Sequence, residues 1–375
     1  MRYFFALIAL ALVSQSCIEP VEPEFQYIEN VLFVEGLAST AEGTSFVSIR
    51  QASTEFGIYQ TSFVEGASVS VENVDTGDQT AFSEDRESYV APTDFVVNPG
   101  ESYKLIVNLP DGRRIESNAE STVDAVEIDN VQINYESELY FDEELERNIP
   151  GHQMRVDFLD PVNVPNYYYF TYRLLEDLKF CERCYDGILR DGSCYRPPGF
   201  RNFPDYYDYQ CDTECWKIRF PESIILYDDQ FSDGLTIENF YVDNLPLYTR
   251  TDALVELQLW TLSEEAYRYY KVLKDLVDNN IGFNAPPPAP LVGNMRNVLD
   301  DEDFVFGRFS VAAASTTAVF IERETLTDLP IEPILPVVFE PTLNSPYPPP
   351  ATILAPCNES RYRTAIKPEN WIDNE

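Results

Sequence analysis

The sequence contains a single histidine, His152, among 375 residues. Catalytic triads built on histidine and metal sites built on two histidines are therefore excluded. The Gly-rich phosphate loop, the nucleophile elbow and the dinucleotide-binding fingerprint are also missing from the sequence. Because His152 lies between Gly151 and Gln153, we expect it in a loop and not at a ligand site. These absences predict a protein that is not an enzyme and holds no cofactor.

Basic residues are also scarce, with 26 Lys and Arg against 64 Asp and Glu, and the formal net charge is -38. Such a chain repels phosphate backbones, so nucleic acid is excluded as a partner. The acidity fits the solubility of an exposed protein, and it also fits the binding of divalent cations or docking on a basic partner. A calcium site would use Asp300, Asp301 and Asp303, although an acidic run of this kind is also typical of a solvated turn.

The sequence has one long apolar run, from Tyr3 to Val13, and at about 11 residues it is too short to span a bilayer. Arg2 precedes this run and small or polar residues lead from it to Cys17, which is the layout of a secretory signal read by a lipoprotein peptidase. We expect residues 1–16 to be a signal peptide and Cys17 to carry lipid as the first mature residue. A plain cleaved signal, with Cys17 incidental, is the alternative, because residues 14–16 depart from the commonest Leu-Ala-Gly.

Residues 17–28 are expected to form a lipidated tether. Three glutamates and two prolines follow Cys17 within this segment, which makes it acidic and stiff. The tether resembles the export signal that sends lipoproteins of the Bacteroidota to the outer face of the outer membrane. The expected location is therefore the outer membrane, with the protein held at the cell surface by its N-terminal lipid.

The remaining chain is long enough for two domains, since single cores stop growing beyond about 250 to 300 residues. Residues 29–122 show short strands of period two, for example at Ala67–Val71, separated by turn signals. The segment Tyr103–Val107 leads through Asp111-Gly112 to Ile115, which is typical of a hairpin. We predict a small immunoglobulin-like β-sandwich for this part of the chain.

Residues 123–375 are predicted to form a larger β-rich domain with one amphipathic helix at 262–281. Thr261 and Glu264 could form the capping box of this helix, and apolar residues recur within it at three- and four-residue spacing. An aromatic segment at 166–172 has bulky residues on both faces, as a central strand covered on both sides requires. A surface on which sugars stack is the alternative for this segment.

Apart from Cys17, six cysteines remain, and five of them crowd an insertion at residues 181–215. A polar loop in an oxidising compartment gains stability from disulfides. We therefore expect three disulfides, of a connectivity that the sequence leaves open, among Cys181, Cys184, Cys194, Cys211, Cys215 and Cys357. The alternative is a four-thiolate zinc site, which the spacing also permits, formed by Cys181, Cys184, Cys211 and Cys215.

The second domain also contains several motifs that are specific when taken together. They are Asn166-Tyr167-Tyr168, Cys215-Trp216, Phe231-Ser232-Asp233-Gly234, Tyr267-Arg268-Tyr269-Tyr270, Phe283-Asn284, Gly293-Asn294, Phe306-Gly307-Arg308-Phe309-Ser310, Lys367-Pro368 and Trp371. This set is similar to the domain-of-unknown-function 4249 family, surface lipoproteins of the Bacteroidota, over most of the mature chain. Family members often have a second cysteine near the end, where this chain has Ser360 after Cys357. The resemblance implies a cell-surface lipoprotein, often encoded beside a TonB-dependent outer-membrane receptor.

Two functions are compatible with the sequence. The preferred one is a non-enzymatic outer-membrane lipoprotein that binds a ligand or docks on a TonB-dependent transport receptor or another β-barrel complex. The alternative is a surface hydrolase that acts through two carboxylates, with or without calcium. Carboxylates are too plentiful in the sequence for any one pair to be chosen.

Overall fold

The computed structural model describes most of the chain and leaves both ends and several internal segments outside its description. The described residues are 31–55, 58–178, 188–190, 193–195, 214–278, 291–323, 325–332, 357 and 359–373. The chain is mainly β, as the sequence predicts, and the described residues contain one α-helix, α2 (Glu264–Asp278). No helix in these ranges combines the length and the hydropathy needed to cross a membrane.

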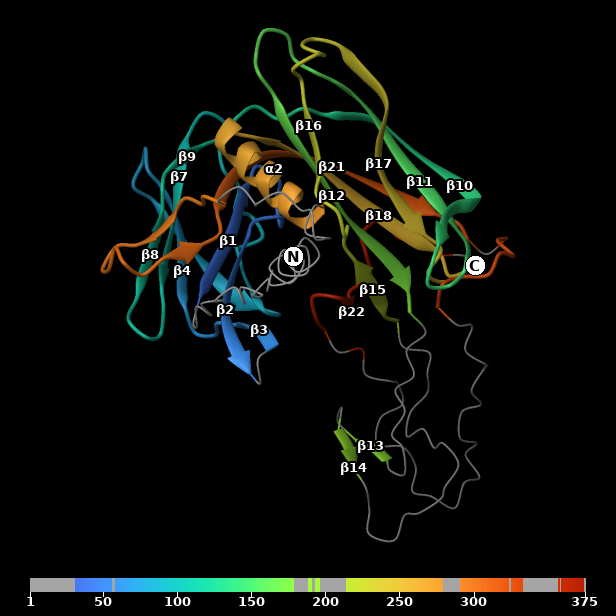
Figure 1. The fold of residues 1–375 in the computed structure, drawn as a ribbon, viewed down its shortest axis with the longest axis horizontal. Coiled ribbons are helices and arrows are strands. Elements are labelled where there is room, and N and C mark those ends of the chain that lie inside the picture. Colours follow the sequence, from blue (N-terminus) through green and yellow to red (C-terminus); the bar gives the residue numbers. More distant parts are fainter. Residues whose placement is uncertain are drawn as a thin grey trace, which may run out of the picture.

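The N-terminal part consists of two strand layers that share one core (Figure 1, blue and cyan). In the first layer, β2 (Phe46–Glu55) pairs with β1 (Leu32–Ser39), β3 (Ile58–Phe63) and β6 (Ser88–Val90). In the second, β7 (Ser102–Asn108) pairs with β4 (Ser68–Asn73), β8 (Arg114–Ser117) and β9 (Glu120–Ser121). Strand β5 (Gln79–Asp85) pairs with both β4 and β6 and so joins the layers.

The shared core of the N-terminal part confirms the alternation read from the sequence. Val69 and Val71 of β4 are buried, and the predicted hairpin is formed by β7 and β8. Val34 of β1 and Leu105 of β7 belong to the same cluster, although they come from different layers. Burial of these apolar side chains at about 25 cal/mol per Å² is what holds the layers together.

Three late strands complete the N-terminal part, which the sequence placed within residues 29–122. Strand β19 (Met295–Asn297) pairs with β8, while β20 (Val305–Phe306) and the start of β21 (Phe309–Ile321) run parallel to β1. The rest of β21, from Ala313, pairs with β18 (Ala253–Leu262) of the second part. One strand therefore belongs to the sheets of both parts.

Gly307 allows this close pairing of β1 with the late strands. Its φ is +104°, and a Cβ built on it would lie 2.1 Å from the carbonyl oxygen of Val34. Only a residue without a side chain fits such an approach. The next residue, Arg308, is buried and pairs with the buried carboxylate of Glu120, so the junction also encloses an ion pair.

The second part is organised around β12 (Tyr167–Asp177). On one side β12 pairs with β18 along its whole length, and on the other it pairs with β15 (Trp216–Arg219) and β16 (Ile225–Asp228). The aromatic segment is therefore a central strand, as the sequence predicts. Strand β22 (Arg363–Thr364) adds to β15 at the sheet edge, and β13 (Ile188–Arg190) pairs with β14 (Ser193–Tyr195) in a separate two-stranded sheet.

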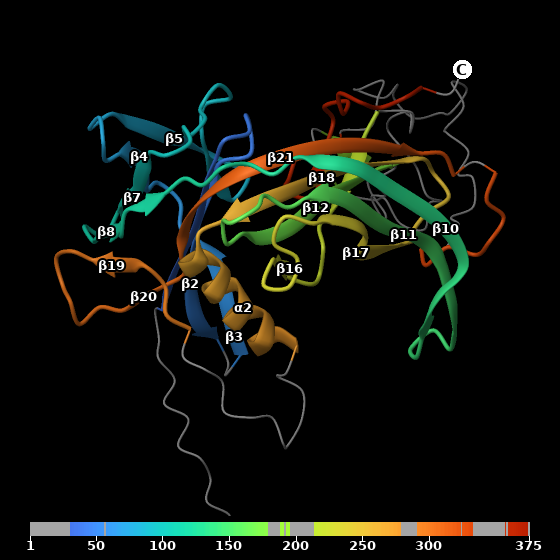
Figure 2. The ribbon, with the colours of Figure 1, turned by 90° about the horizontal axis from the view of Figure 1, so that it is seen from above.

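Both faces of β12 are covered. A three-stranded sheet of β10 (Ile128–Asp142), β11 (Arg147–Leu159) and β17 (Thr236–Pro246) packs on the face that carries Tyr168 and Phe170. Helix α2 packs on the opposite face, where Tyr169 contacts Trp260 and Tyr270 with ring centroids 5.1 and 4.9 Å away. Figure 2 shows α2 on one side of the ribbon formed by β12, β18 and β21.

The start of the helix differs from the prediction. Ser263, and not Thr261, caps α2, because its Oγ accepts a hydrogen bond from the backbone N–H of Ala266 at 3.2 Å. Thr261 is still part of β18, whose pairing with β12 continues to Leu262. The predicted end of the helix at residues 279–281 lies outside the described residues.

The prediction of a loop around His152 is wrong. His152 lies in the middle of β11, opposite Tyr135 of β10 and Leu245 of β17, and its side chain is 4% exposed. Gly151 suggested a turn, but the glycine serves a close approach, since a Cβ there would lie 2.5 Å from the carbonyl oxygen of Leu245. Gly151 therefore marks the close packing of β11 against β17 and not a turn.

Candidate ligand-binding cleft

The described residues form a cleft of about 320 Å³ between the three-stranded sheet and the end of β12. Its walls come from β10, β12, β15, the segment that follows β15, β17 with the segment after it, and the end of α2 at Asp278. Four aromatic side chains line it, namely Tyr140, Tyr172, Phe220 and Tyr248. The polar lining groups include Arg219, Glu222, Asp243 and Asn244. Concave sites with ring walls and a few polar groups are the usual form of small-ligand sites.

Tyr172 connects the aromatic strand to this cleft. It follows Tyr168 and Phe170 on the same face of β12, since successive alternate residues of a strand share a face. Its hydroxyl donates a hydrogen bond of 2.9 Å to Asp243 Oδ2, and the backbone N–H of Asn244 donates one of 2.9 Å to Asp243 Oδ1. Burial raises the pKa of Asp243 above its ordinary value, and these two hydrogen bonds offset only part of that effect.

Arg219 is held by its neighbours. Its guanidinium carbon lies 3.7 Å from the ring centroid of Tyr248, which is a cation–π contact. Its Nε donates to Glu176 at 2.7 Å and its Nη2 donates to Glu332 at 2.5 Å. Lys217 also donates to Glu332, at 2.5 Å. Both carboxylates that hold Arg219 are shared with a second cation, because Glu332 also pairs with Lys217 and Glu176 also pairs with the buried Arg323.

Two acceptor groups of the cleft have no basic partner among the described residues. Within the described ranges, the carboxylate of Asp243 is bonded by Tyr172 and the backbone alone, and no ion pair reaches the exposed Glu222. In addition, Asn244 Oδ1 is buried and has no hydrogen-bond partner in this part of the chain. A buried acceptor left unpaired costs about 1 to 3 kcal/mol, so a ligand that donates a hydrogen bond there would recover that energy.

A second surface feature lies at the loops 160–165 and 229–235, which we call the apolar loop pair. Asp160 is buried and accepts hydrogen bonds from the Tyr168 hydroxyl and from the N–H of Gly234. Asp229 accepts from the N–H of Asn166 at 2.8 Å, and burial raises its pKa. These bonds fix the two loops against each other.

The apolar loop pair leaves large apolar side chains in water. Phe231 is 90% exposed, and Val162, Val164 and Leu235 are each more than half exposed. Exposed apolar groups that gather on one surface are typical of contact sites for another protein. Phe231 belongs to a motif that carried the family resemblance, whereas the sequence alone did not reveal that its ring is exposed.

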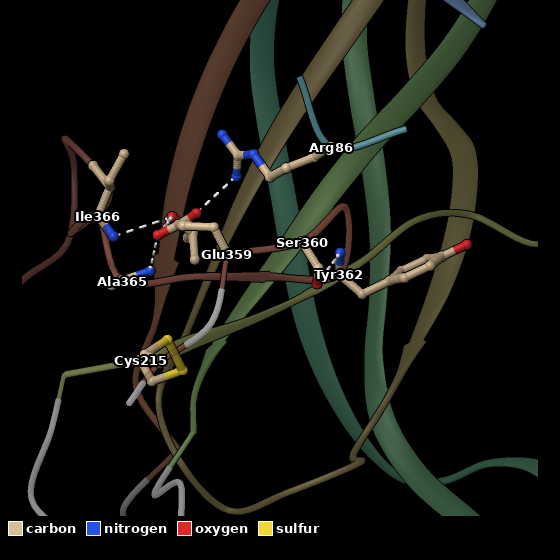
Figure 3. Close-up of a disulfide and its surroundings, with 9 residues drawn as sticks. Arg86, Cys215, Glu359, Ser360, Tyr362, Ala365 and Ile366 are labelled. Carbon is tan, nitrogen blue, oxygen red and sulfur yellow. Dashed lines mark hydrogen bonds and ion pairs between the residues drawn. A yellow bond between two sulfur atoms is a disulfide. The ribbon is translucent and has the colours of Figure 1, made fainter. Parts of the chain in front are cut away.

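Three of the cysteines for which disulfides were predicted lie among the described residues. Cys215 and Cys357 form a disulfide with a Cα–Cα distance of 5.7 Å (Figure 3). A cysteine in a disulfide has no thiolate to give to zinc, so this bond favours the disulfide interpretation for Cys215. Only the backbone of Cys194 is described, in β14. The remaining predicted cysteines, Cys17, Cys181, Cys184 and Cys211, lie outside the described residues.

The disulfide fixes the C-terminal segment onto the body. Glu359, two residues after Cys357, receives a hydrogen bond of 2.8 Å from Arg86 in the β5–β6 turn and one of 2.6 Å from the N–H of Ala365 (Figure 3). Trp371 packs its ring against Trp216 and Phe320, with centroid distances of 5.8 and 5.3 Å. The end of the chain therefore contacts both parts of the fold.

The acidic run at residues 300–303 forms a turn between β19 and β20. Asp300 accepts a hydrogen bond from the N–H of Glu302 at 3.0 Å, and Asp303 accepts one from Asn297 at 2.9 Å. Arg113 also lies 3.6 Å from Asp303. Within the part of the chain that the structure describes, no three acidic, histidine or cysteine side chains gather as a metal site would require.

The cleft residues outside β12 were not singled out from the sequence. Asp243 and Asn244 come from one strand, Arg219 from another, and Tyr248 from the connection after β17. One weak signal exists, since Asp243-Asn244 interrupts an apolar segment between the buried Val242 and Leu245. Polar residues within such a segment indicate a specific role when they are buried, but burial is known only from the fold.

Comparison with known protein families gives a match. A family model described as "Domain of unknown function (DUF4249)" matches residues 18–318. The match spans the strands from β1 to near the end of β21 and includes the lining residues of the cleft and the apolar loop pair. No curated protein matches the chain.

Proposed function

We propose, from the premise that the chain belongs to the domain-of-unknown-function 4249 (DUF4249) family, that it is a non-enzymatic lipoprotein of the outer membrane. In this proposal the protein is exposed at the cell surface, binds a small ligand in the cleft, and docks on a TonB-dependent transport receptor or another β-barrel complex. The cleft carries the proposal, because its rings and its unpaired acceptor Asn244 Oδ1 suit the binding of a ligand.

Native mass spectrometry tests the binding role. Protein purified under mild conditions from its own outer membrane is expected to retain a small molecule. Replacing Asn244 by Leu removes the unpaired acceptor and should abolish this retention. Asn134→Leu is the matched control, because Asn134 is exposed on β10 and does not line the cleft. Equal retention by both variants, or a wild-type protein that carries no ligand and binds none from a metabolite library, would contradict the binding role.

The lipid anchor is supported by the sequence alone, through the apolar run and Cys17. Mass spectrometry of the mature N-terminus is expected to find an acylated cysteine at position 17. Protease added to intact cells should cleave the exposed body. An unmodified native N-terminus, or complete protection in intact cells, would remove the proposed location.

Docking is supported by the apolar loop pair. Tagged protein from detergent-solubilised outer membrane is expected to co-purify with a β-barrel receptor. Phe231→Ser should reduce that recovery, because it removes an apolar ring that is 90% exposed. Phe304→Ser is the matched control, since Phe304 is 78% exposed on a different loop. Recovery of the lipoprotein alone, or equal loss in both variants, would count against this docking site.

One observation favours the hydrolase as a second candidate. Asp243, whose pKa burial raises, and Glu222 line the same cleft, and two carboxyl groups in one cleft are what acid–base hydrolysis of a glycoside requires. Turnover of a polysaccharide or peptide panel that is lost in Asp243→Asn would establish this candidate. Inactivity of the wild-type protein against the panel would leave the non-enzymatic function.

A further inference from the structure

We infer that the cleft selects an organic cation with several N–H donors, of the guanidinium or ammonium class found in basic peptides. This inference rests on the proposed ligand-binding role of the same cleft and names the chemical class of its ligand. It depends on the arrangement of charges, acceptors and rings around the lining residues.

The charges of the cleft favour a cation over an anion. Among the lining residues Arg219 is the one cation, and it is already paired with Glu176 and Glu332 at 2.7 and 2.5 Å. Asp243 and Glu222 line the same space without a basic partner among the described residues. An anionic ligand would find two uncompensated carboxylates there, whereas a cation would pair with them.

The hydrogen-bonding groups favour a ligand that donates. Asn244 Oδ1 is a buried acceptor with no partner, and both carboxylates are acceptors. The Tyr172 hydroxyl already donates to Asp243, so it is not free to donate to a ligand. A guanidinium group carries five N–H donors and no acceptor, and its planar edge suits a carboxylate.

The rings of the cleft already hold guanidinium groups of the chain itself. Arg219 lies over Tyr248 at 3.7 Å, and the exposed Arg361 lies over Phe220 at 5.1 Å. Both rings line the cleft, and Tyr140 and Tyr172 add two further aromatic side chains. Rings of this kind attract cations through their negative faces, most strongly where water is excluded.

Calorimetric titration of the purified mature protein tests the inference. The probes are N-acetyl-arginine amide and N-acetyl-citrulline amide, which have nearly the same shape but differ in charge. We expect the arginine probe to bind about tenfold more tightly than the citrulline probe, because hydrogen bonds to charged groups are the stronger ones. Asp243→Asn should weaken binding of the arginine probe about tenfold, while it keeps an acceptor for the Tyr172 hydroxyl.

Asp301→Asn is the control for the general acidity of the chain. Asp301 is exposed in the turn at residues 300–303, and its replacement changes the net charge by the same amount. Equal affinity for both probes, or equal weakening by Asp243→Asn and Asp301→Asn, would overturn the inference. A neutral or anionic ligand retained in native mass spectrometry and lost in Asn244→Leu would overturn it too, but would leave the binding function in place. If Asn244→Leu retained the ligand as fully as the wild-type protein does, the binding function of the cleft itself would be refuted.

Discussion

The single histidine of the chain gives a sharp test of the fold. His152 is buried between β10 and β17, with its ring centroid 5.2 Å from that of Tyr135. Its Nδ1 has no hydrogen-bond partner among the described residues. Burial and, to a smaller extent, the charge of Arg323 together lower the pKa of His152 from 6.5 to about 4.

This lowered pKa makes stability depend on pH in a defined window. Below pH 6.5 the unfolded chain takes up a proton on His152, while the folded chain stays neutral there until about pH 4. Proton uptake therefore stabilises the unfolded state between these values, and the free energy of unfolding decreases as the pH falls through this range. A difference of this size corresponds to about 3 kcal/mol, all of which is present above pH 6.5.

Urea unfolding of the wild-type protein and of His152→Phe measures the effect. Relative to the variant, the wild-type protein should lose about 2 to 3 kcal/mol between about pH 7.5 and about pH 4.5. Asn134→His provides the control, because a histidine at this exposed position of β10 should titrate normally and add no pH dependence to stability. The wild-type protein has one imidazole to follow by NMR, and a measured pKa near 6.5 would refute the buried placement.

Three further predictions test the disulfide, the buried ion pair and the close approach of β1 to the late strands. Replacing Cys215 and Cys357 by Ser should lower the free energy of unfolding, measured with urea, by up to about 5 kcal/mol, because the disulfide joins residues 142 positions apart. Arg308→Met should lower the free energy of unfolding in urea by about 3 to 5 kcal/mol, because it leaves the buried carboxylate of Glu120 without its ion pair. Adding Glu120→Gln should recover part of that loss. Gly307→Ala should destabilise by more than about 3 kcal/mol, whereas Gly77→Ala, in open space at φ +80°, should cost only about 1 kcal/mol by thermal melting.

Local patterns in the sequence predicted the elements whose cause is local. Alternation in β4 and the turn residues between β7 and β8 depend on residues a few positions apart, and both predictions are confirmed. The aromatic segment was predicted as a central strand because bulky residues on both faces need two covers, and β12 has them. The helix cap was predicted at Thr261 but is Ser263, because β18 continues to Leu262 and the helix begins directly after it.

Contacts between segments that are far apart in the sequence could not be predicted from such local patterns. The pairing of β1 with β21 joins residues more than 250 positions apart, such as Gly36 and Phe309, and nothing near either residue specifies the other. The glycines at this junction carried a signal, since a glycine marks either a turn or a close approach. His152 was misplaced because the neighbouring glycine was interpreted as a turn, although its role is the close approach of β17.

The cleft also depends on residues that follow the family match, which ends at residue 318. Glu332, which accepts a hydrogen bond from Arg219, lies after this point, and its N–H donates to the carbonyl of Tyr248 at 3.0 Å. Arg361, over the ring of Phe220, is held in place by a segment that the Cys215–Cys357 disulfide fixes. A chain truncated at the end of the match would lose both groups and would leave the Arg219 guanidinium with Glu176 alone. The groups that hold the Arg219 guanidinium and cover the Phe220 ring are therefore supplied by the whole chain and not by the matched segment alone.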